Sequence, residues 1–201
     1  VNSDETEQLS RELVLKKLKP VIESKDIKIV GQNIKFDRNI LAKYCIYIDS
    51  IENDTMLMSY ILNSTATRHN LDALAQHYLG QKTTTFEEIA GKGVKQITFD
   101  QVPISKAAHY ASEDADITLS LYEKLYPILK KEPDLVKLLE EIEIPLIKVL
   151  SDMEQTGTLL NPKVLKAQSK SLSKRIHKLE EEAYSLAGEE FNLGSPKQLQ
   201  E

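Results

Sequence analysis

Three features are missing from this sequence of 201 residues, and each absence excludes a class of protein. Cys45 is the single cysteine, which excludes an internal disulfide framework and favours a reducing compartment, with the cytosol as the expected location. The four histidines show none of the spacings of a zinc site, so we assign them no metal. No signal peptide is recognisable, and no apolar run approaches the roughly 18 residues of a membrane span, so we expect no membrane partner.

Composition places the chain among globular proteins rather than disordered ones. Its length suits one large domain or a domain and a half, with 28% charged and 41% hydrophobic residues. The net charge of −5 argues mildly against a general nucleic-acid wrapper. The charge is unevenly distributed, however, since six basic residues and no acidic one lie between Pro162 and Leu179. Local patches therefore matter more than the sum.

The first part of the chain alternates short β-rich runs with helical patterns. A helix stripe covers residues 14–22, where Pro20 should kink or interrupt it. We predict strands over 27–31 and 46–51, and helices over 36–44 and 54–62, the last with Asp54 as its N-cap. This alternation predicts parallel strand pairing with helices packed on the sheet, although two strands make an unusually small parallel sheet.

The remainder of the chain reads as helical, so the predicted fold class is α/β but predominantly helical. Helical patterns cover residues 70–79, 86–90 and 103–131, the first two ended by Gly80 and Gly91. Glu132-Pro133-Asp134 breaks the pattern and divides the chain into domains 1–133 and 134–201. A helix over 135–154 tolerates or is kinked by Pro145, and Asn161-Pro162 opens another whose apolar seam suits packing along a partner helix.

The most specific chemistry lies in the stretch from Tyr110 to Asp116. Tyr110 and Asp114 are four residues apart and share a helix face. A carboxylate can hold a hard divalent cation, and a phenol one turn away can orient the water that the cation activates. Asn33 and Asp37 form a second such pair, so we expect Asp37 and Asp114 to converge on one cleft. In isolation each is better explained as an ordinary residue of a helix face, and Asp116 is expected to face solvent.

Five segments, taken in order, resemble bacterial DNA polymerase I, a family A DNA polymerase. They are Gly31 to Asp37, Asp54 to Leu57, Thr85 to Gly93, Tyr110 to Asp116 and Gly188 to Leu193. The resemblance implies a ribonuclease H-like (DEDD-type) 3′→5′ proofreading exonuclease domain followed by polymerase-thumb helices. It implies a DNA-directed DNA polymerase of replication and repair in the bacterial nucleoid, with Mg²⁺ or Mn²⁺ as cofactor. Its partner would be DNA, with a single-stranded 3′ end at the exonuclease cleft and duplex at the thumb.

The resemblance also implies roles for individual residues. Asp37, Tyr110 and Asp114 would be catalytic, with Asp114 a direct metal ligand, Asp37 acting on the second metal largely through water, and Tyr110 orienting the attacking water. The residues implied to contact DNA are Gln32, Asn33, Phe36, Arg68, Phe86, Lys170, Lys174 and Arg175. Phe36 departs from the tyrosine usual in the family. Phe86 is equally a stacking or a core residue, and the basic run is equally a solvated helix face.

The family's first motif, Asp-x-Glu on the first strand, has no counterpart here; Glu5-Thr-Glu7 echoes it without a preceding strand. The resemblance therefore implies an incomplete fold whose first strands lie before Val1. We expect weak Mg²⁺ binding, little or no exonuclease activity of this chain alone, and self-association through the uncovered sheet edge. Two alternatives stay open: a non-catalytic DNA-binding scaffold with the exonuclease fold, and a stand-alone RNA-processing exonuclease.

Overall fold

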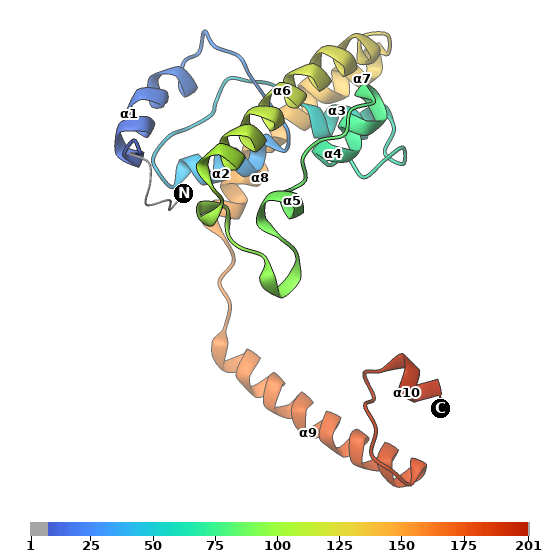
Figure 1. Cartoon of the computed structure of the whole chain (residues 1–201). Helices are drawn as coiled ribbons and strands as arrows, with labels where there is room; N and C mark the ends of the chain where they lie inside the picture. The colour runs from blue at the N-terminus through green and yellow to red at the C-terminus, as the bar shows by residue number, and fades with distance from the viewer. Residues whose placement is uncertain (1–7, 201) are drawn as a thin grey trace. The chain divides into compact units, whose positions relative to one another are not determined.

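The structure is a computed structural model that describes residues 8–200. Its contacts divide the chain into two compact units, one up to Thr156 and one from Gly157 onward. Figure 1 shows the order of the elements along the chain. Each unit is described by itself below, and the Glu5-Thr-Glu7 echo lies outside the described residues.

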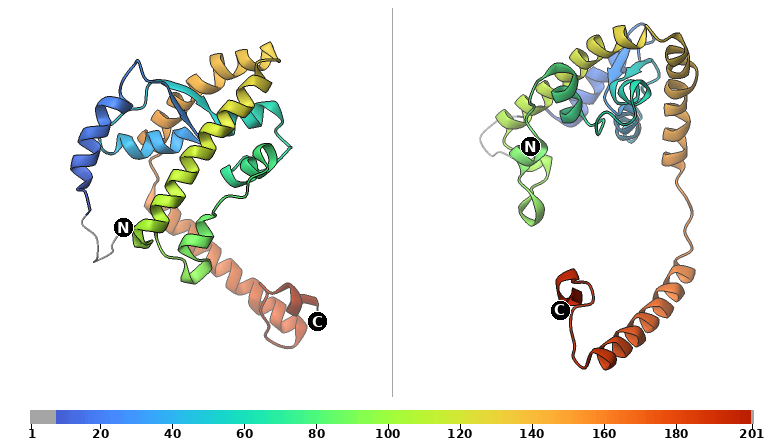
Figure 2. Two further views of the ribbon diagram at one scale, coloured as in Figure 1. Left: turned by 45° about the horizontal axis from the view of Figure 1, so that its top comes forward. Right: turned by 90° about the vertical axis from the view of Figure 1, so that its right-hand side faces the viewer.

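A small parallel sheet lies at the centre of the first unit. Strands β1 (Ile29–Gly31) and β2 (Ile51–Asp54) pair in parallel, as predicted, and they are the two strands of the sheet in the described part of the chain. Gly31 stands opposite Asp54. The sheet lies between helix α6 (Ile104–Leu129) and helix α8 (Ile144–Thr156), with α6 contacting β1 and α8 contacting β2 (Figure 2).

The second strand begins later than predicted. Helix α2 (Ile34–Ala42) ends in a tight turn in which Cys45 has a φ of 57° and the Ile46 N–H donates to the Leu41 carbonyl oxygen at 3.1 Å. After this turn, residues 46–50 connect α2 to β2 and belong to neither. Ile46 and Ile48 are buried in this stretch but do not belong to a strand. The apolar pattern that predicted a strand here therefore arises from packing in the core and not from pairing in the sheet.

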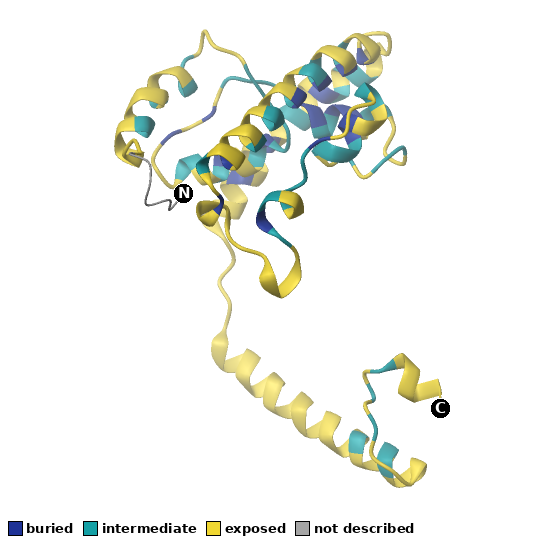
Figure 3. Ribbon diagram, viewed as in Figure 1, coloured by how far each residue is buried: buried dark blue, intermediate teal, exposed yellow. Residues whose placement is uncertain are grey.

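The main core of this unit is the inward face of α6. Ile117, Leu121, Leu125 and Leu129 follow each other at helical spacing and are at most 4% exposed. They pack on Met58 from α3 (Thr55–Leu62) and on Leu74 from α4 (Leu71–Leu74). This buried face of α6 is dark blue in Figure 3. Burial along so long a helix fixes its position against the sheet.

Most helix ends fall where the sequence predicts them. The Asp54 side chain accepts from the N–H groups of Met56 and Leu57, which confirms it as the N-cap of α3. A capping box between Thr85 and Glu88 opens α5 (Phe86–Ala90), and Gly91 ends it. The π-helical turn η1 (Ala75–Leu79) extends α4 to the predicted stop at Gly80. The 3₁₀ turns η2 (Gly93–Lys95) and η3 (Phe99–Gln101) lead from α5 to α6.

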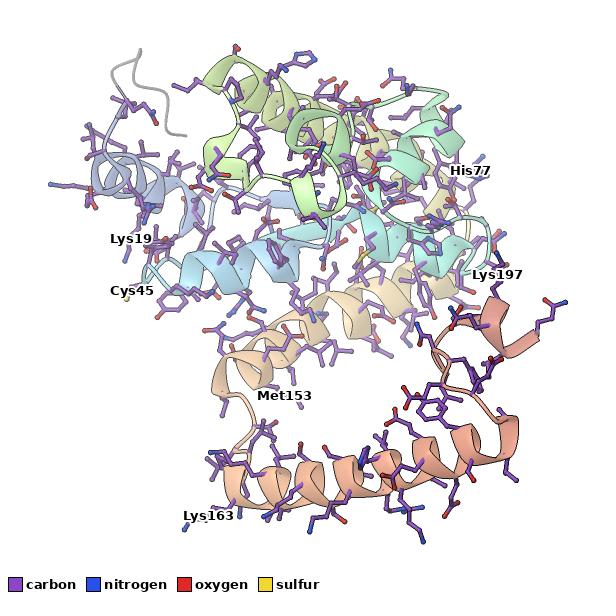
Figure 4. The ribbon with its side chains drawn as sticks, turned by 60° about the horizontal axis from the view of Figure 1, so that its bottom comes forward. Lys19, Cys45, His77, Met153, Lys163 and Lys197 are labelled. Atoms are coloured by element: carbon purple, nitrogen blue, oxygen red, sulfur yellow. The ribbon has the colours of Figure 1, made fainter. Side chains whose placement is uncertain are left out.

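Helix α1 (Arg11–Ile22) continues past Pro20, where an interruption or kink was predicted, and ends only at Ile22. Pro20 removes one hydrogen bond, that of its own missing N–H to the Lys16 carbonyl oxygen, and only two residues of the helix follow it. The Lys19 ammonium donates to the Cys45 carbonyl oxygen at 2.6 Å, and Figure 4 labels both residues. This contact ties α1 to the turn that follows α2.

Helix α7 (Pro133–Leu138), the π-helical turn η4 (Leu139–Glu143) and α8 follow one another without a loop. The cause is Pro145, which lacks an N–H and whose ring would collide with the carbonyl of Glu141 in an α-helix. In the wider turn the Ile144 N–H bonds to the Leu139 carbonyl oxygen five residues earlier. Leu139 therefore packs into the α6 core while Ile147 packs on Ile34 of α2.

The compact unit consequently extends to Thr156, beyond the domain boundary predicted at 133/134. Two observations explain the difference: Ile147 is 4% exposed against α2, and Ser151 of α8 is fully buried. The break at Pro133 is a real change of direction between α6 and α7, but it does not end the packing. Which residues belong to a polymerase-like part stays a prediction.

The second unit is built on α9 (Pro162–Ala187). Asn161 caps it by accepting from the N–H groups of Lys163 and Val164, and Gly188 ends it at a φ of 82°, as the sequence predicts. Tyr184 packs its ring on Phe191, and α10 (Pro196–Gln200) follows. The apolar seam of α9 is exposed: Leu165, Leu172, Ile176 and Leu179 are 49 to 57% accessible.

Candidate active site

The first unit contains a cavity of about 740 Å³ where the end of β1 meets α2, the start of α4 and α6. Asp37 and Asp114, which lie far apart in the chain, both line it. The convergence of these two carboxylates predicted from the sequence is therefore confirmed. Tyr110, Gln32 and Asp72 contribute to the same wall.

Tyr110 and Asp114 meet one turn apart on α6, as their spacing predicts. Their side chains lie close enough for each to shift the pKa of the other. Burial, and next the negative charge of Asp114, raise the pKa of Tyr110 to about 12. At neutral pH the side chain is thus a neutral phenol, able to donate or accept a hydrogen bond but unable to act as a phenolate base.

Both carboxylates stand in surroundings that disfavour their negative charge. Partial burial raises the pKa of Asp114, and the charges of Asp72 and Glu113 raise it further against the opposing effect of the nearby Tyr110 hydroxyl. Partial burial, followed by the charge of Asp54, raises the pKa of Asp37. Such crowding favours any bound positive charge, whether a proton or a metal cation.

Tyr110 belongs to a cluster of three aromatic rings. The ring centroids of Phe86, Phe99 and Tyr110 lie 6.1 to 6.3 Å from one another. Phe86 is half-buried against the small core of Ala90, Val102 and Ala107. Phe86 therefore packs as a core residue on one side and keeps part of its ring accessible on the other. Its predicted stacking on DNA stays a prediction.

The other residues predicted to contact DNA are dispersed. Gln32 lines the cavity, and its side chain donates to the His69 carbonyl oxygen at 2.9 Å. Arg68 and Phe36 are exposed and lie outside the described lining of this cavity, with Phe36 61% accessible. Lys170, Lys174 and Arg175 are exposed on α9, in the other unit. The structure thus leaves their roles as predictions.

The predicted pairing of Asn33 with Asp37 is wrong. Asn33 has a φ of 56°, in the left-handed region, so it stands outside the helical phase that would place it on the face of Asp37. Its side chain lines a separate small cavity with Lys35 and Leu57 instead. Asparagine adopts the left-handed conformation more readily than most residues, but nothing else in the sequence predicts that conformation at Asn33.

Sequence reasoning missed two acidic residues of this region. Asp72, in the first turn of α4, lines the cavity and accepts from the Thr83 hydroxyl at 2.7 Å. Glu113 accepts from the Thr84 N–H at 2.8 Å and so ties the start of the α5 segment to α6. The signal for Asp72 was present, since it follows the helix start at Asn70, but a first-turn acidic residue is common in any helix.

The donor chemistry of the cavity fits part of a metal site. Carboxylate oxygens are the ligands that Mg²⁺ and Mn²⁺ prefer, and Asp37 and Asp114 supply them from two sides. Within residues 8–200, no group of three or more His, Cys, Asp or Glu side chains is arranged to hold an ion. Asp116 is exposed, as predicted. None of the described helices is long and apolar enough to cross a membrane.

Together the fold and the cavity define a predominantly helical α/β protein with an acid-lined site beside a parallel sheet. A family model described as 3′-5′ exonuclease matches residues 3–130, and the chain belongs to this family. The predicted helix-rich α/β class agrees with this membership.

Relatives with the name DNA polymerase I confirm the resemblance drawn from the five segments. The chain is 50% identical to DNA polymerase I of Pseudomonas aeruginosa over 195 residues, which are 96% of this chain and 21% of that protein. It is 41% identical to DNA polymerase I of Rhizobium leguminosarum over 92% of this chain and 18% of that protein. The chain thus spans about a fifth of the length of these relatives.

A solved structure shares the fold. It is the POL domain of Pol1 from M. smegmatis in complex with DNA primer-template and dNTP, with a TM-score of 0.68 and 23% sequence identity. The match covers 96% of this chain and 30% of that one. At this identity the likeness shows the fold alone.

Proposed function

We propose that the cavity is part of a divalent-metal-dependent 3′→5′ exonuclease site that removes mispaired nucleotides from a DNA 3′ end. The site would belong to a DNA polymerase I that also synthesises DNA on a template during replication and repair, in the bacterial nucleoid. The observation that carries the proposal is the convergence of Asp37 and Asp114 on one cavity, which Tyr110 also lines, one helical turn from Asp114.

The residues divide the chemistry between them. Asp37 and Asp114 would hold Mg²⁺ or Mn²⁺, which when bound lowers the pKa of water and offsets charge on the phosphate. Tyr110, a neutral phenol at neutral pH, would hold the water that attacks the terminal phosphorus. The new bond joins the water oxygen to phosphorus, and the bond to the 3′ oxygen of the preceding nucleotide breaks. The products are a nucleoside monophosphate and a strand shorter by one nucleotide.

The DNA contacts belong to the same proposal. Gln32, Asn33, Phe36 and Arg68 would border the single strand, and Phe86 would stack on its terminal bases through the accessible side of its ring. Lys170, Lys174 and Arg175 would meet duplex phosphates, and their exposure on α9 supports this. Neutralising these three residues should flatten the salt dependence of duplex binding.

Nuclease assays test the site itself. In the longer polymerase, Asp37→Asn and Asp114→Asn should each slow release of 3′ nucleotides from a 5′-labelled single strand about a hundredfold or more, because a lost metal ligand removes several kcal/mol of stabilisation. Asp116→Asn is the matched control, since Asp116 is exposed two residues further along α6. Full activity of both site variants would exclude the proposal.

The chain by itself is expected to be a poor nuclease. Two carboxylates only partly offset the repulsion of two ions roughly 3.5–4 Å apart, so Mg²⁺ should bind weakly to residues 1–201 alone. Digestion of single-stranded DNA by the pure chain at the rate of the longer polymerase would contradict this expectation.

We further propose that the sheet belongs to a larger ribonuclease H-like (DEDD-type) sheet and that the isolated chain self-associates along β1. Ile27, just before this strand, is 41% exposed, which supports an accessible edge. Sedimentation equilibrium should then show dimers that Ile29→Lys dissociates. A monomer at all concentrations would exclude self-association.

A further inference from the structure

Asp54 is a fully buried carboxylate at the end of β2, with 1% of its surface accessible. Its two oxygens accept four backbone hydrogen bonds. Oδ1 accepts from Met56 at 2.9 Å and from Leu57 at 3.3 Å, in the first turn of α3. Oδ1 also accepts from Asn33 at 3.1 Å, and Oδ2 accepts from Ile34 at 2.8 Å, at the start of α2.

One side chain thus satisfies the starts of two helices that come from different parts of the chain. The free N–H groups of a first helical turn need acceptors, and the positive end of the helix dipole favours an anion there. The cap of α2 comes from Asp54, across the sheet, while Asn33 occupies the left-handed region at the cap position. The Gly31–Asp54 pairing in the sheet brings the carboxylate to this place.

An ordinary N-cap does not require this arrangement. To cap α3 alone, a serine hydroxyl would suffice, because only the Met56 and Leu57 N–H groups would need an acceptor. Burying a charged carboxylate is costly unless hydrogen bonds offset the loss of water. Burial still raises the pKa of Asp54, but the two additional bonds to Asn33 and Ile34 oppose this effect and at the same time fix where α2 begins.

The start of α2 matters because Asp37 lies in its first turn, at the cavity. We infer that Asp54 is a positioning residue for Asp37: by holding the Asn33 and Ile34 N–H groups, it fixes the first turn of α2 against the end of β2. The inference rests on the proposed function, in which Asp37 faces a divalent cation.

Two substitutions separate this role from capping of α3. Asp54→Ser keeps an acceptor for Met56 and Leu57 but is too short to reach Asn33 and Ile34. Asp54→Asn keeps one acceptor oxygen, so it retains the three bonds of Oδ1 and loses the one to Ile34. The control is Ser10→Ala, which removes the side-chain cap at Leu13 of the remote helix α1.

The first readout is amide hydrogen exchange of the 201-residue chain. In Asp54→Ser, the amides of Asn33 and Ile34 should exchange at least roughly tenfold faster, because each loses its acceptor, while those of Met56 and Leu57 stay protected. Asp54→Asn should affect mainly the Ile34 amide. Ser10→Ala should leave all four unchanged.

The second readout is paramagnetic line broadening of NMR signals by millimolar Mn²⁺, which reports even weak binding. In the unaltered chain, we expect broadening around residues 36–38 and 110–114. Asp54→Ser should reduce it roughly tenfold around 36–38, and Asp54→Asn, which removes the same negative charge but keeps three of the four bonds, should reduce it less. Ser10→Ala should match the unaltered chain.

The outcomes are distinguishable. If Asp54→Ser frees the Asn33 and Ile34 amides but broadening around 36–38 is unchanged, Asp54 is a structural cap only and the inference is overturned. If the unaltered chain shows no broadening around 36–38, Asp37 does not face a cation, and the proposed function fails together with the inference. If Asp54→Ser unfolds, hydrogen exchange and line broadening are both measured on Asp54→Asn instead. Broadening in Asp54→Asn equal to that of the unaltered chain then overturns the inference.

Discussion

The two helices that bring carboxylates to the cavity are held by different forces. Helix α6, with Asp114, runs for 26 residues and buries an apolar face of Ile117, Leu121, Leu125 and Leu129. Helix α2, with Asp37, runs for nine residues and buries two side chains, the apolar Ile34 and the charged Arg38, so polar contacts form a larger share of what holds it. Asp54 holds its start, and Arg38, only 3% exposed, donates to Ser151 of α8 at 3.0 Å.

This difference predicts how the loss of a contact should affect each of the two helices. Apolar packing is strong and non-directional, so a loss in α6 lowers the stability of the whole unit. Hydrogen bonds are directional and individually modest, so a loss at α2 should displace a local segment before it unfolds the unit. The predictions below test this contrast, from the largest expected effect to the smallest.

Leu121→Ala should have the largest effect. Leu121 is fully buried in the α6 core, so its truncation should lower the free energy of unfolding by about 2–5 kcal/mol. Urea denaturation measures the change. Leu119→Ala, on the same helix but 52% exposed, is the matched control and should cost much less. Equal losses at the two positions would mean that α6 is not held by its apolar face.

Arg38→Met should have a smaller effect, about 1–3 kcal/mol, because it leaves the buried Ser151 hydroxyl without its charged donor while keeping an apolar stem. The ion pairs of Arg38 with Asp49 and Asp152, at 3.6 Å each, involve exposed carboxylates and add little. Lys35→Met breaks an ion pair with Glu154 at the surface of the same helix, and it should cost less than about 1 kcal/mol. Urea denaturation measures both losses of unfolding free energy. Equal losses would mean that the buried contact of Arg38 contributes no more to stability than the surface ion pair of Lys35.

Asp114→Asn should stabilise the protein at neutral pH. Because the pKa of Asp114 is raised in the folded state, folding favours the protonated carboxyl, and stability falls as pH rises from the ordinary value of 3.8 through the raised one. A neutral amide removes that penalty, by at most roughly 1 kcal/mol, since solvent screens a half-exposed group. Thermal melts from pH 3 to pH 8 should show the gain only at the higher pH. A variant that melts lower at pH 8 would contradict the raised pKa.

Lys178→Ala should have the smallest effect. Lys178 and Glu182 form an ion pair at 3.6 Å on α9, and both side chains are more than half exposed. Such pairs contribute within about 0.5 kcal/mol, unlike the buried contacts of Arg38. Circular dichroism melting of the chain should show no resolvable shift. A clear loss would mean that polar contacts on α9 are as important as those on α2.

Local signals predicted much of the fold, because they depend on neighbours in sequence. Asn161 and Gly188 mark the ends of α9, and the spacing of Tyr110 and Asp114 predicted that both would face the same cavity. Contacts between residues far apart in the sequence were harder to predict. The second acceptor role of Asp54 depends on N–H groups about 20 residues earlier, and a sequence pattern does not contain that distance.

Other differences arose from backbone conformations that residue type only weakly determines. The left-handed turn at Cys45 displaced the second strand, and the same conformation at Asn33 removed it from the face of Asp37. The cavity's third acidic residue, Asp72, was hidden because first-turn acidic residues are common on helices of every kind. The resemblance to the family predicted residue roles, whereas the geometry shows which contacts hold those residues in place.

The wide turn before Pro145 makes the helical stretch from 133 to 156 sensitive to its own length. In this turn the Ile144 N–H bonds five residues back instead of four, so η4 holds one residue more than an α-helical turn of the same span. Deleting that residue would leave Ile144 four residues after Leu139, as in an α-helix, and would bring the Pro145 ring against the carbonyl four residues before it. The extra residue is thus what lets a proline stand inside one continuous run of helix.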